Sequence, residues 1–368
     1  MKKYDIAAYI WPAYTGDEPR TRIFWEEGIG EWQTVKNSAP KDNGYHWSRK
    51  PLWGYQNEAD PYVMESQIEC AVDHGVNVFI YDWYWYDGRP FLENCLNDGF
   101  LKAKNRNKMK FYIMWANHDA NYTWDKRNAG VSDATVWQGA VTRAQFEEIG
   151  RRWIEKYFKE ENYYTVDGKP VVSIYDLRNF VRGLGGIEGA RDAMEWLRRE
   201  ASAAGLPGVH FQFVRWRANI ANISGVDGGA TETSADLTEK LGFDSLTHYQ
   251  FVHFANVDRD YLEILDDVKA EWEGIVNEHK IPYYPHVSIG WDNNPRFRHF
   301  VGRVVKNNTP ENFKRALLSA KELADREGVS LITVNSWNEW TETSYLLPDD
   351  VNGYGYLEAI KQVFAEEK

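Results

Sequence analysis

Residues 62–83, YVMESQIECAVDHGVNVFIYDW, contain the repeating unit on which the fold depends. The first half has apolar residues at helical spacing and ends at Gly75, a residue type that commonly follows the last turn of a helix. The second half, Val76–Trp83, is short and nearly continuous in apolar and β-branched residues, which is typical of a strand buried on both faces. We therefore predict a helix over 62–74 followed by a buried strand.

The same two kinds of segment alternate along the chain. Strand-like runs lie at Ile6–Trp11, Val76–Trp83, Lys110–Trp115, Val171–Tyr175, His210–Val214, Ser245–Gln250, Tyr283–Ile289 and Ser330–Trp337. Further helical patterns lie at 142–158, 189–204, 261–279, 310–327 and 355–364. This alternation predicts an α/β fold, a single (β/α)8 TIM-type barrel over residues 1–368. A doubly wound open sheet is the alternative, but the glycine-rich phosphate turn of that fold is missing after the first strand.

Three long segments follow predicted strands, at residues 11–60, 116–142 and 215–242. Barrel enzymes place their active sites at the carboxyl ends of the strands, where such loops lie. Long loops in compact domains are usually functional. We expect these segments to be the βα loops that surround a site.

Charge and hydropathy exclude several classes of function. The mean hydropathy is −0.61 and no apolar run approaches 18 residues, which excludes a membrane span. Acidic residues outnumber basic residues by 55 to 43, so we expect no nucleic-acid partner. Two cysteines exclude a disulfide scaffold, and we expect both to be buried thiols on helices. No apolar segment follows Met1-Lys2-Lys3, so the chain as written is expected in the cytoplasm; removal of a signal would instead indicate a periplasmic or secreted protein.

Aromatic residues are unusually frequent, with 17 Trp, 22 Tyr and 17 Phe. Many lie in polar, loop-like stretches, where exposed rings suit the flat apolar faces of sugar rings. Core packing is the alternative and must account for at least half of them. The composition therefore favours a carbohydrate ligand.

The strongest chemical signal lies at the end of the last strand, in Asn335-Ser336-Trp337-Asn338-Glu339-Trp340-Thr341-Glu342. Residues three apart on an extended strand point to opposite faces, so both carboxylates reach one cleft only if the chain turns after Glu339. Glycoside hydrolysis requires such a pair, with one carboxyl protonated and the other ionised. The alternative is structural: Glu339 ends the strand and Glu342 caps a turn.

The run Asn338–Glu342, followed by Leu346-Leu347-Pro348-Asp349 and Gly353-Tyr354, resembles the last-strand motif of glycoside hydrolase family 99. More closely, it resembles the family-99-like WbsX group of bacterial polysaccharide-locus proteins. Further matches cover nearly the whole chain: Ala8-Tyr9, Tyr81–Tyr86, Trp115–His118 and Gly290–Arg296. Two departures are Thr343, where glycine often follows the second glutamate, and Leu347, where the WbsX-like pattern has a further carboxylate.

The resemblance implies a retaining, endo-acting α-mannosidase or mannanase that uses no metal or other cofactor. It implies that Glu342 is the acid/base that protonates the leaving oxygen and then activates water. It implies that Glu339 takes the proton of the sugar 2-hydroxyl, so that the 2-oxygen forms a 1,2-anhydro intermediate. The expected partner is therefore an oligosaccharide or polysaccharide, α-linked and mannose-type or related.

Supporting positions are predicted from strand ends and from the matched motifs. The predicted substrate-binding residues are Tyr9, Asp82, Trp83, Trp85, Asn117, Trp124, Tyr249, Asp292, Arg296 and Trp340. For the tyrosines the alternative is a rim hydrogen bond to backbone, and for the tryptophans it is core packing. Asp82 and Asn117 could instead tie loops together, and Arg296 could form a surface salt bridge.

Other chemistries lack their sequence signals. The nine histidines show no ligand spacing, so we expect no metal site, and His286 is expected to be satisfied within the barrel. No G-x-S-x-G elbow, Walker A motif or dinucleotide fingerprint occurs. Two rivals remain: a glycosyltransferase or transglycosylase in surface-polysaccharide assembly, and a non-catalytic glycan-binding barrel. The second has no need for Glu339 and Glu342 together.

Overall fold

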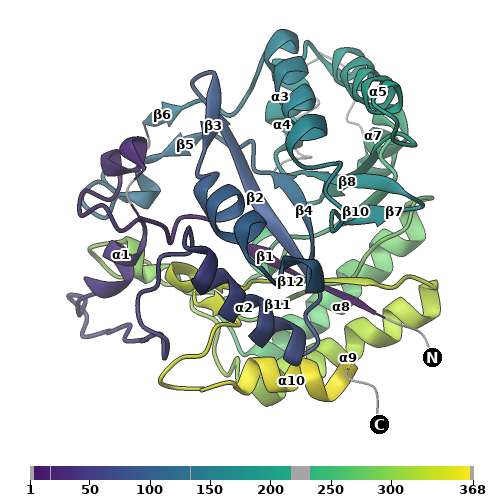
Figure 1. The fold of residues 1–368 in the computed structure, drawn as a ribbon. Helices are drawn as coiled ribbons and strands as arrows, with labels where there is room; N and C mark the ends of the chain where they lie inside the picture. Colours follow the sequence, from purple (N-terminus) through teal and green to yellow (C-terminus); the bar gives the residue numbers. More distant parts are fainter. Residues whose placement is uncertain (1–3, 17, 133, 217–232, 365–368) are drawn as a thin grey trace.

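The computed structural model describes residues 4–16, 18–132, 134–216 and 233–364. Its centre is a barrel of parallel strands, as predicted (Figure 1). The barrel strands are β1 (Asp5–Ile10), β2 (Val78–Tyr86), β4 (Lys110–Trp115), β8 (Lys169–Ile174), β9 (His210–Val214), β10 (Ser245–Thr247), β11 (His286–Ser288) and β12 (Leu331–Asn335). They are hydrogen-bonded in the order β10-β9-β8-β4-β2-β1-β12-β11. A parallel bridge between Leu246 and Tyr283, just before β11, closes the ring.

Helices cover the outside of the barrel (Figure 1). They are α2 (Pro61–Asp73), α3 (Arg143–Lys156), α5 (Ile187–Ala203), α7 (Ser234–Leu241), α8 (Tyr261–Glu278), α9 (Pro310–Glu327) and α10 (Gly355–Phe364). Their buried faces follow the apolar periodicity of the sequence, and side chains cap several of them. Asp60, Asp260 and Thr309 each accept a hydrogen bond from a backbone amide of the first turn.

The loops contain elements that the hydrophobic pattern did not reveal. Helix α7 lies within the predicted loop 215–242, where a capping box at Thr233 begins it and Gly242 at φ +77° ends it. The remaining part of that loop, 217–232, lies outside the described residues. Short helices α1 (Trp32–Lys36) and α4 (Leu177–Gly183) lie in other βα segments. Between residues 92 and 109 the chain has only short helical segments, and Cys95 begins the first of them, the π-helix Cys95–Gly99.

Strand β2 runs three residues past its predicted end. Tyr84–Tyr86 pair with β3 (Arg89–Phe91) in an antiparallel hairpin, so the aromatic stretch continues as strand above the barrel rim. A second hairpin of β5 (Ala120–Asn121) and β6 (Thr135–Trp137) rises beside it (Figure 1). The two hairpins build one wall of the barrel mouth.

Polar side chains that satisfy one another fill the barrel interior below the mouth. Tyr112 and Ser173 both donate to Gln212 Oε1, at 3.1 and 2.7 Å. His286 lies 2.9 Å from the hydroxyls of both Thr333 and Ser288, and burial lowers its pKa well below the usual value. His286 is thus satisfied within the barrel, as expected, and the filled floor leaves space for a ligand only above it.

Candidate active site

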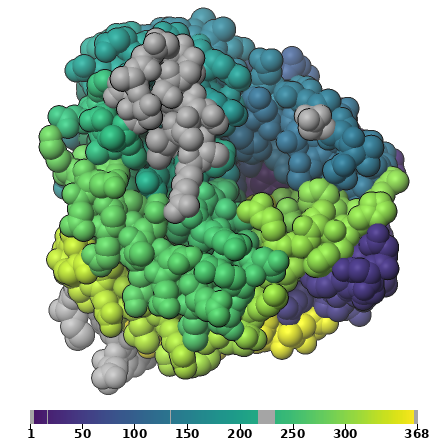
Figure 2. Space-filling view, turned by 180° about the vertical axis from the view of Figure 1, so that it is seen from behind, coloured from purple at the N-terminus to yellow at the C-terminus, as the bar shows by residue number. Residues whose placement is uncertain are grey.

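A cavity of about 460 Å³ opens at the carboxyl ends of the strands. Figure 2 shows a hollow on the face opposite that of Figure 1, between the blue surface of the β5–β6 region and the yellow-green surface that follows β11. Aromatic side chains form much of the wall: Trp11, Tyr84, Trp124, Tyr175, Trp216 and Tyr249. The charged residues in the wall are Asp82, Asp119, Asp176, Arg178, Arg296, Glu339 and Glu342. Both predicted carboxylates therefore face one cavity.

The chain turns immediately after Glu339, which is the condition for both carboxylates to reach the cavity. After β12, the segment forms β13 (Asn338–Glu339), a 3-10 turn η8 (Trp340–Glu342) and β14 (Ser344–Tyr345). The Glu339 amide donates to Ser336 Oγ at 2.8 Å. Trp340 stacks on Tyr345 with ring centroids 3.9 Å apart. This packing holds the short hairpin, and hence the two carboxylates, in a fixed geometry.

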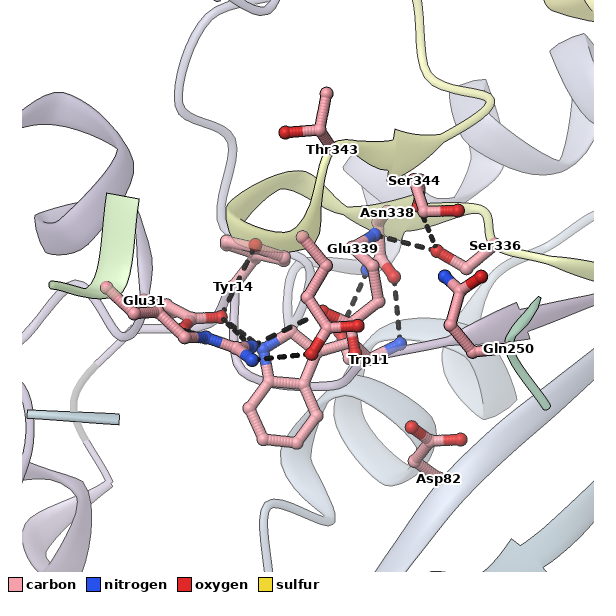
Figure 3. Close-up of polar contacts among 12 residues, drawn as sticks. Trp11, Tyr14, Glu31, Asp82, Gln250, Ser336, Asn338, Glu339, Thr343 and Ser344 are labelled. Carbon is pink, nitrogen blue, oxygen red and sulfur yellow. Dashed lines mark hydrogen bonds and ion pairs between the residues drawn. The ribbon is translucent and has the colours of Figure 1, made fainter. Parts of the chain in front are cut away.

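Arg296, at the end of the 3-10 turn η7 (Asn294–Arg296), binds both members of the pair. Its Nη1 donates to Glu342 Oε1 at 2.6 Å and its Nη2 to Glu339 Oε2 at 3.4 Å. Its Nε donates to Oε1 of a third carboxylate, Glu31, at 2.8 Å. Glu31 is fully buried just before α1 and also accepts from Trp11 Nε1 at 2.6 Å (Figure 3). One guanidinium therefore fixes three carboxylates from two distant parts of the chain.

This arrangement shifts the proton affinity of the pair. Burial, and then the Glu342 carboxylate, raise the pKa of Glu339 well above its usual value. Burial also raises the pKa of Glu342, while Arg296 opposes the shift. Burial lowers the pKa of Arg296, but Glu31 and Glu342 outweigh it and raise that pKa well above the ordinary value. Because a single cation faces three carboxylates, the pair holds a proton more tightly than ordinary glutamates do.

Tyr249, just after β10, connects Glu339 to a fourth carboxyl group. Its hydroxyl lies 2.9 Å from Asp82 Oδ2 and 3.0 Å from Glu339 Oε1. A phenol has one proton and can donate it to only one of the two. Burial raises the pKa of Asp82 well above its usual value, so a neutral Asp82 can donate to Tyr249 while Tyr249 donates to Glu339. This arrangement gives a proton to both the Asp82–Tyr249 contact and the Tyr249–Glu339 contact.

The second oxygen of Asp82 lacks a partner. Asp82 is 4% exposed, lines the cavity, and its Oδ1 makes no hydrogen bond within the structure. Figure 3 shows Asp82 below Glu339, on a different side from Glu31. A buried polar atom without a partner is costly unless a ligand satisfies it. Asp82 is therefore placed to bind a polar group of a ligand.

The two faces of β2 separate the predicted residues of that strand. Successive side chains on a strand point to opposite faces, so Asp82 and Tyr84 face the cavity. Trp83 and Trp85 face the surrounding helices and do not line the cavity: they stack on each other, and Trp83 also contacts Trp153 of α3. Trp83 donates its indole N–H to Glu93 at 2.8 Å. Both tryptophans take the alternative role of core packing.

Four further predicted residues lie near the cavity without lining it. Tyr9 donates to the His248 carbonyl oxygen at 3.0 Å. The side-chain amide of Asn117 donates to the Asp176 carbonyl oxygen and accepts from the Asp176 backbone N–H, which ties two loops together. The Asp292 carboxylate accepts hydrogen bonds from the side chains of Tyr45 and Asn294. Its backbone N–H donates to the Glu342 carbonyl oxygen at 2.8 Å. Trp340 is fully buried beneath the hairpin. Trp124, Tyr249 and Arg296 do line the cavity.

Several cavity residues were not predicted. Tyr84 follows Asp82 by two positions, so the strand periodicity alone could have identified it. Tyr175, Asp176 and Trp216 come directly after β8 and β9, at the strand ends where barrel sites lie. Glu31 has no comparable signal, because its partner Arg296 is 265 residues away in the sequence.

Thr343 explains why glycine suits the position after the second glutamate. Its backbone has φ +55°, a left-handed conformation that is rare for a β-branched residue. Its hydroxyl accepts from Trp47 Nε1 at 2.7 Å and donates to the Asp292 carbonyl oxygen at 2.9 Å. The threonine thus has an unfavourable backbone conformation, but its hydroxyl makes two hydrogen bonds that tie the first βα loop to the hairpin.

The described residues lack the features of two other types of site. No group of three or more His, Cys, Asp or Glu side chains among them has an arrangement that could hold a metal ion. In the same ranges, no helix has both the length and the apolar character needed to cross a bilayer.

Comparisons with known proteins identify the family. A family model described as "Glycosyltransferase WbsX" matches residues 6–360. The chain belongs to the WbsX family. Two curated relatives, both called "Uncharacterized protein WxcX", come from two strains of Xanthomonas campestris pv. campestris. Each is 25% identical over 350 residues, which cover 94% of this chain and 47% of the relative. This WbsX-family chain thus spans about half the length of the curated relatives it matches.

Solved structures show the same barrel. A GH99 endo-alpha-mannosidase from Bacteroides thetaiotaomicron is 14% identical, with a TM-score of 0.59, covering 99% of this chain and 97% of that one. A "Glycoside hydrolase-like protein" is 14% identical, with a TM-score of 0.63, covering 99% and 94%. At such identity the likeness is one of fold. This WbsX-family chain therefore shares a (β/α)8 barrel with glycoside hydrolases along nearly its whole length.

Proposed function

We propose that the protein is a retaining glycoside hydrolase that cleaves α-linked, mannose-type oligosaccharides or polysaccharides. The observation that carries the proposal is the placement of Glu339 and Glu342 in one cavity on one guanidinium, with aromatic walls around them. A glycan-binding protein has no need for this pair, whose burial costs free energy. The fold likeness to a GH99 endo-alpha-mannosidase supports the same chemistry.

Glu342 is the proposed acid/base. Burial raises its pKa, which favours the protonated form that can donate to the glycosidic oxygen as the bond to C1 breaks. Its side chain is 12% exposed, against 5% for Glu339, so it is the carboxyl more accessible to water. After the leaving group departs, the Glu342 carboxylate takes a proton from the attacking water, which restores the acid.

Glu339 is the proposed base at the sugar 2-hydroxyl. Burial and Glu342 raise its pKa, and the hydrogen bonds that Arg296 and Tyr249 donate to its carboxylate oppose that rise by stabilising the ionised form needed for this role. The carboxylate takes the 2-hydroxyl proton while the 2-oxygen bonds to C1 and the C1–leaving-group bond breaks. Water then opens the 1,2-anhydro ring at C1, the proton returns to the 2-oxygen, and the product has the configuration of the substrate.

The cavity walls supply the proposed sugar contacts. Tyr84, Trp124, Tyr175 and Trp216 offer apolar ring faces, and the unpaired Asp82 Oδ1 offers an acceptor for a sugar hydroxyl. Asp82 also lies next to Tyr249, which contacts Glu339, so a hydroxyl bound by Asp82 would lie close to the reacting centre. We expect these contacts to hold the sugar that carries the reacting 2-hydroxyl beside Glu339.

Product analysis by mass spectrometry and NMR tests the proposal. Purified protein is incubated with a panel of α-linked mannose-containing and other oligosaccharides, in parallel with Glu339→Gln and Glu342→Gln. The matched control is Glu322→Gln, an exposed position on α9 that does not line the cavity. We expect cleavage with retained anomeric configuration by the wild type and the control only. Inverted product, or equal cleavage by the two site variants, would contradict the assignment.

Glycosyl transfer is the second candidate, and the description of the matching family favours it. The same pair can pass the glycosyl group to a sugar hydroxyl instead of water, because either nucleophile is activated by Glu342. Adding a free acceptor sugar to the reaction separates the two. Longer products at the expense of hydrolysis would identify a transglycosylase.

A further inference from the structure

A second pocket of about 210 Å³ lies beside the catalytic cavity. Its wall comes from the first βα loop, through Phe24 and the α1 residues Gln33 and Thr34, and from residues after Trp124 and after Arg296. The Phe24 ring lies edge-on to Trp124, with centroids 5.3 Å apart, and Trp124 lines the catalytic cavity. The contacting rings of Phe24 and Trp124 thus separate the second pocket from the catalytic cavity.

Arg127 satisfies the two acidic residues of this wall. It donates to Asp125 at 2.8 and 3.1 Å and forms an ion pair with Glu26 at 2.6 Å. Asp125 also accepts from Asn128 at 2.8 Å. Both carboxylates are therefore neutralised locally, and Arg127 has little capacity left for a ligand.

Lys126 and Arg298, the other two cations in the wall, have no carboxylate partner. Within the part of the chain that the structure describes, neither forms an ion pair, and the Lys126 ammonium donates only to the Asn37 carbonyl oxygen, at 2.7 Å. Lys41 is buried behind them and donates to the Phe297 carbonyl oxygen. Burial, and then Arg298, lower the pKa of Lys126; burial, and then Lys126, lower that of Lys41. The three cations thus lie close enough to repel one another.

Asp292 and Asp42 partly offset the charge of Lys41, but Lys126 and Arg298 form no ion pair among the described residues, which is unexpected in a protein whose formal net charge is −12. The neighbouring cavity has the opposite sign, with five carboxyl groups against two guanidinium groups in its wall. An anionic group is therefore repelled from the cavity and attracted to the pocket next to it. Lys126 retains two N–H donors and Arg298 retains its guanidinium donors for charge-assisted hydrogen bonds.

We propose that this basic pocket, formed around Lys126 and Arg298, binds an acidic substituent of the glycan whose glycosidic bond lies in the catalytic cavity. The substituent carries a carboxylate or a phosphate, and it lies on a sugar outside the one that reacts. The proposal rests on the proposed function for the presence of a glycan in the cavity. It identifies the substrate class as an acidic rather than a neutral polysaccharide.

The test measures binding and cleavage separately. Calorimetry with Glu342→Gln protein uses three α-linked manno-oligosaccharides of equal length: neutral, uronate-containing and phosphorylated. The same three are then offered to protein with an intact Glu342, and kcat/KM is measured. A Lys126→Gln/Arg298→Gln variant is compared with Lys269→Gln, an exposed lysine on α8, as the control.

We expect at least one acidic oligosaccharide to bind roughly ten-fold or more tightly than the neutral one, with an advantage that shrinks as salt is added. The double variant should lose that advantage and keep the affinity for the neutral sugar. The uronate and phosphate arms identify which anion the pocket takes.

The outcomes separate this proposal from the proposed function. Tight binding of an acidic glycan without cleavage would support the pocket and overturn the hydrolase. Cleavage with equal affinity for neutral and acidic sugars, or a preference that persists in the double variant, would overturn the pocket alone. Absence of binding by all three sugars would overturn both.

Discussion

Neighbouring residues on the two faces of β2 have different roles: those on the outer face pack against other side chains, and those on the inner face line the cavity. On the outer face, Trp83 packs on Trp85 and Trp153 and has its indole N–H satisfied by Glu93. On the inner face, Asp82 is also buried, but its Oδ1 has no hydrogen-bond partner among the described residues. On the outer face the indole N–H of Trp83 is satisfied within the protein, whereas on the inner face the unpaired Asp82 oxygen faces the cavity and can bind a ligand.

This difference separates stability from function within one strand. Around the inner face, three carboxylates share one guanidinium and Asp82 joins them through Tyr249, an arrangement whose desolvation opposes folding. The outer aromatic layer buries large apolar surfaces and stabilises the barrel. Substitutions on the two sides should therefore be distinguishable by what they change: turnover on the inside and the free energy of unfolding on the outside.

The largest effect is expected from Glu342→Gln on the inner side. An amide cannot donate an acidic proton to the leaving oxygen, so turnover should fall by roughly 10²- to 10⁴-fold. The pH profile of the residual activity should also lose its basic limb, because the limb reports the ionisation of this acid. Steady-state kinetics between pH 5 and 9, with denaturant unfolding on the same samples, make the measurement. Turnover within a few-fold of the wild type would remove Glu342 from the mechanism.

On the outer side, Trp83→Ala should cost about 3–5 kcal/mol of unfolding free energy, the usual range for removing a buried tryptophan. It also leaves Glu93 without one of its donors. The folded fraction should keep a kcat within a few-fold of the wild type. Trp53→Ala, at a half-buried position that contacts Tyr354, is the control with a smaller expected loss. A large fall in kcat with little change in stability would mean that Trp83 does serve the cavity.

Glu58 is a buried carboxyl group that lies behind the catalytic hairpin rather than in the cavity. It accepts from Asn338 Nδ2 at 2.8 Å, and burial raises its pKa to about 8. Between an unfolded pKa of about 4.3 and that value, the folded state holds a proton that the unfolded state lacks, so stability falls as pH rises. The slope is at most about 1.4 kcal/mol per pH unit.

Glu58→Gln removes this ionisation and should flatten the dependence. The stability of the variant relative to the wild type should increase by about 2 kcal/mol between pH 6 and pH 8. Urea unfolding of both proteins at pH 6, 7 and 8 measures the difference, in which all other titrating groups cancel. Parallel curves would show that Glu58 titrates alike in the folded and unfolded states.

Tyr249→Phe tests the hydrogen bonds between Asp82 and Glu339. Removing the hydroxyl takes a donor from the Glu339 carboxylate, worth about 1.5–3 kcal/mol for a charged partner, so kcat/KM should fall roughly ten- to hundred-fold. Loss of the donor raises the pKa of the base, and the acidic limb of the pH profile should move to higher pH. Tyr112→Phe, whose hydroxyl binds Gln212 in the barrel floor, is the matched control. An unmoved acidic limb would show that Tyr249 does not act on the base.

Local patterns predicted the barrel because they depend on neighbouring residues. The apolar strand runs and the helix periodicity fixed all eight barrel strands to within a few residues, and the turn required after Glu339 is present. Helix α7 was missed because the capping residue Thr233, rather than a long apolar stripe, defines it. The prediction that Trp83 and Trp85 bind the ligand did not take into account that alternate residues of a strand point to opposite faces, so that they cannot share a face with Asp82. Glu31 could not be found at all, since only tertiary structure brings it to Arg296.

The smallest effect is expected at Thr343, where the hairpin meets the first βα loop. Thr343→Gly relieves a left-handed β-branched residue, worth about 1–2 kcal/mol, but loses two hydrogen bonds worth about 1 kcal/mol each. These terms nearly cancel, so unfolding free energy should stay within about 1 kcal/mol of the wild type. Thr343→Ala loses the same hydrogen bonds and keeps the Cβ, so it should be less stable than the glycine variant by about 1 kcal/mol. Denaturant unfolding of the two variants side by side measures that difference, and equal stabilities would mean that the backbone at residue 343 stores no strain.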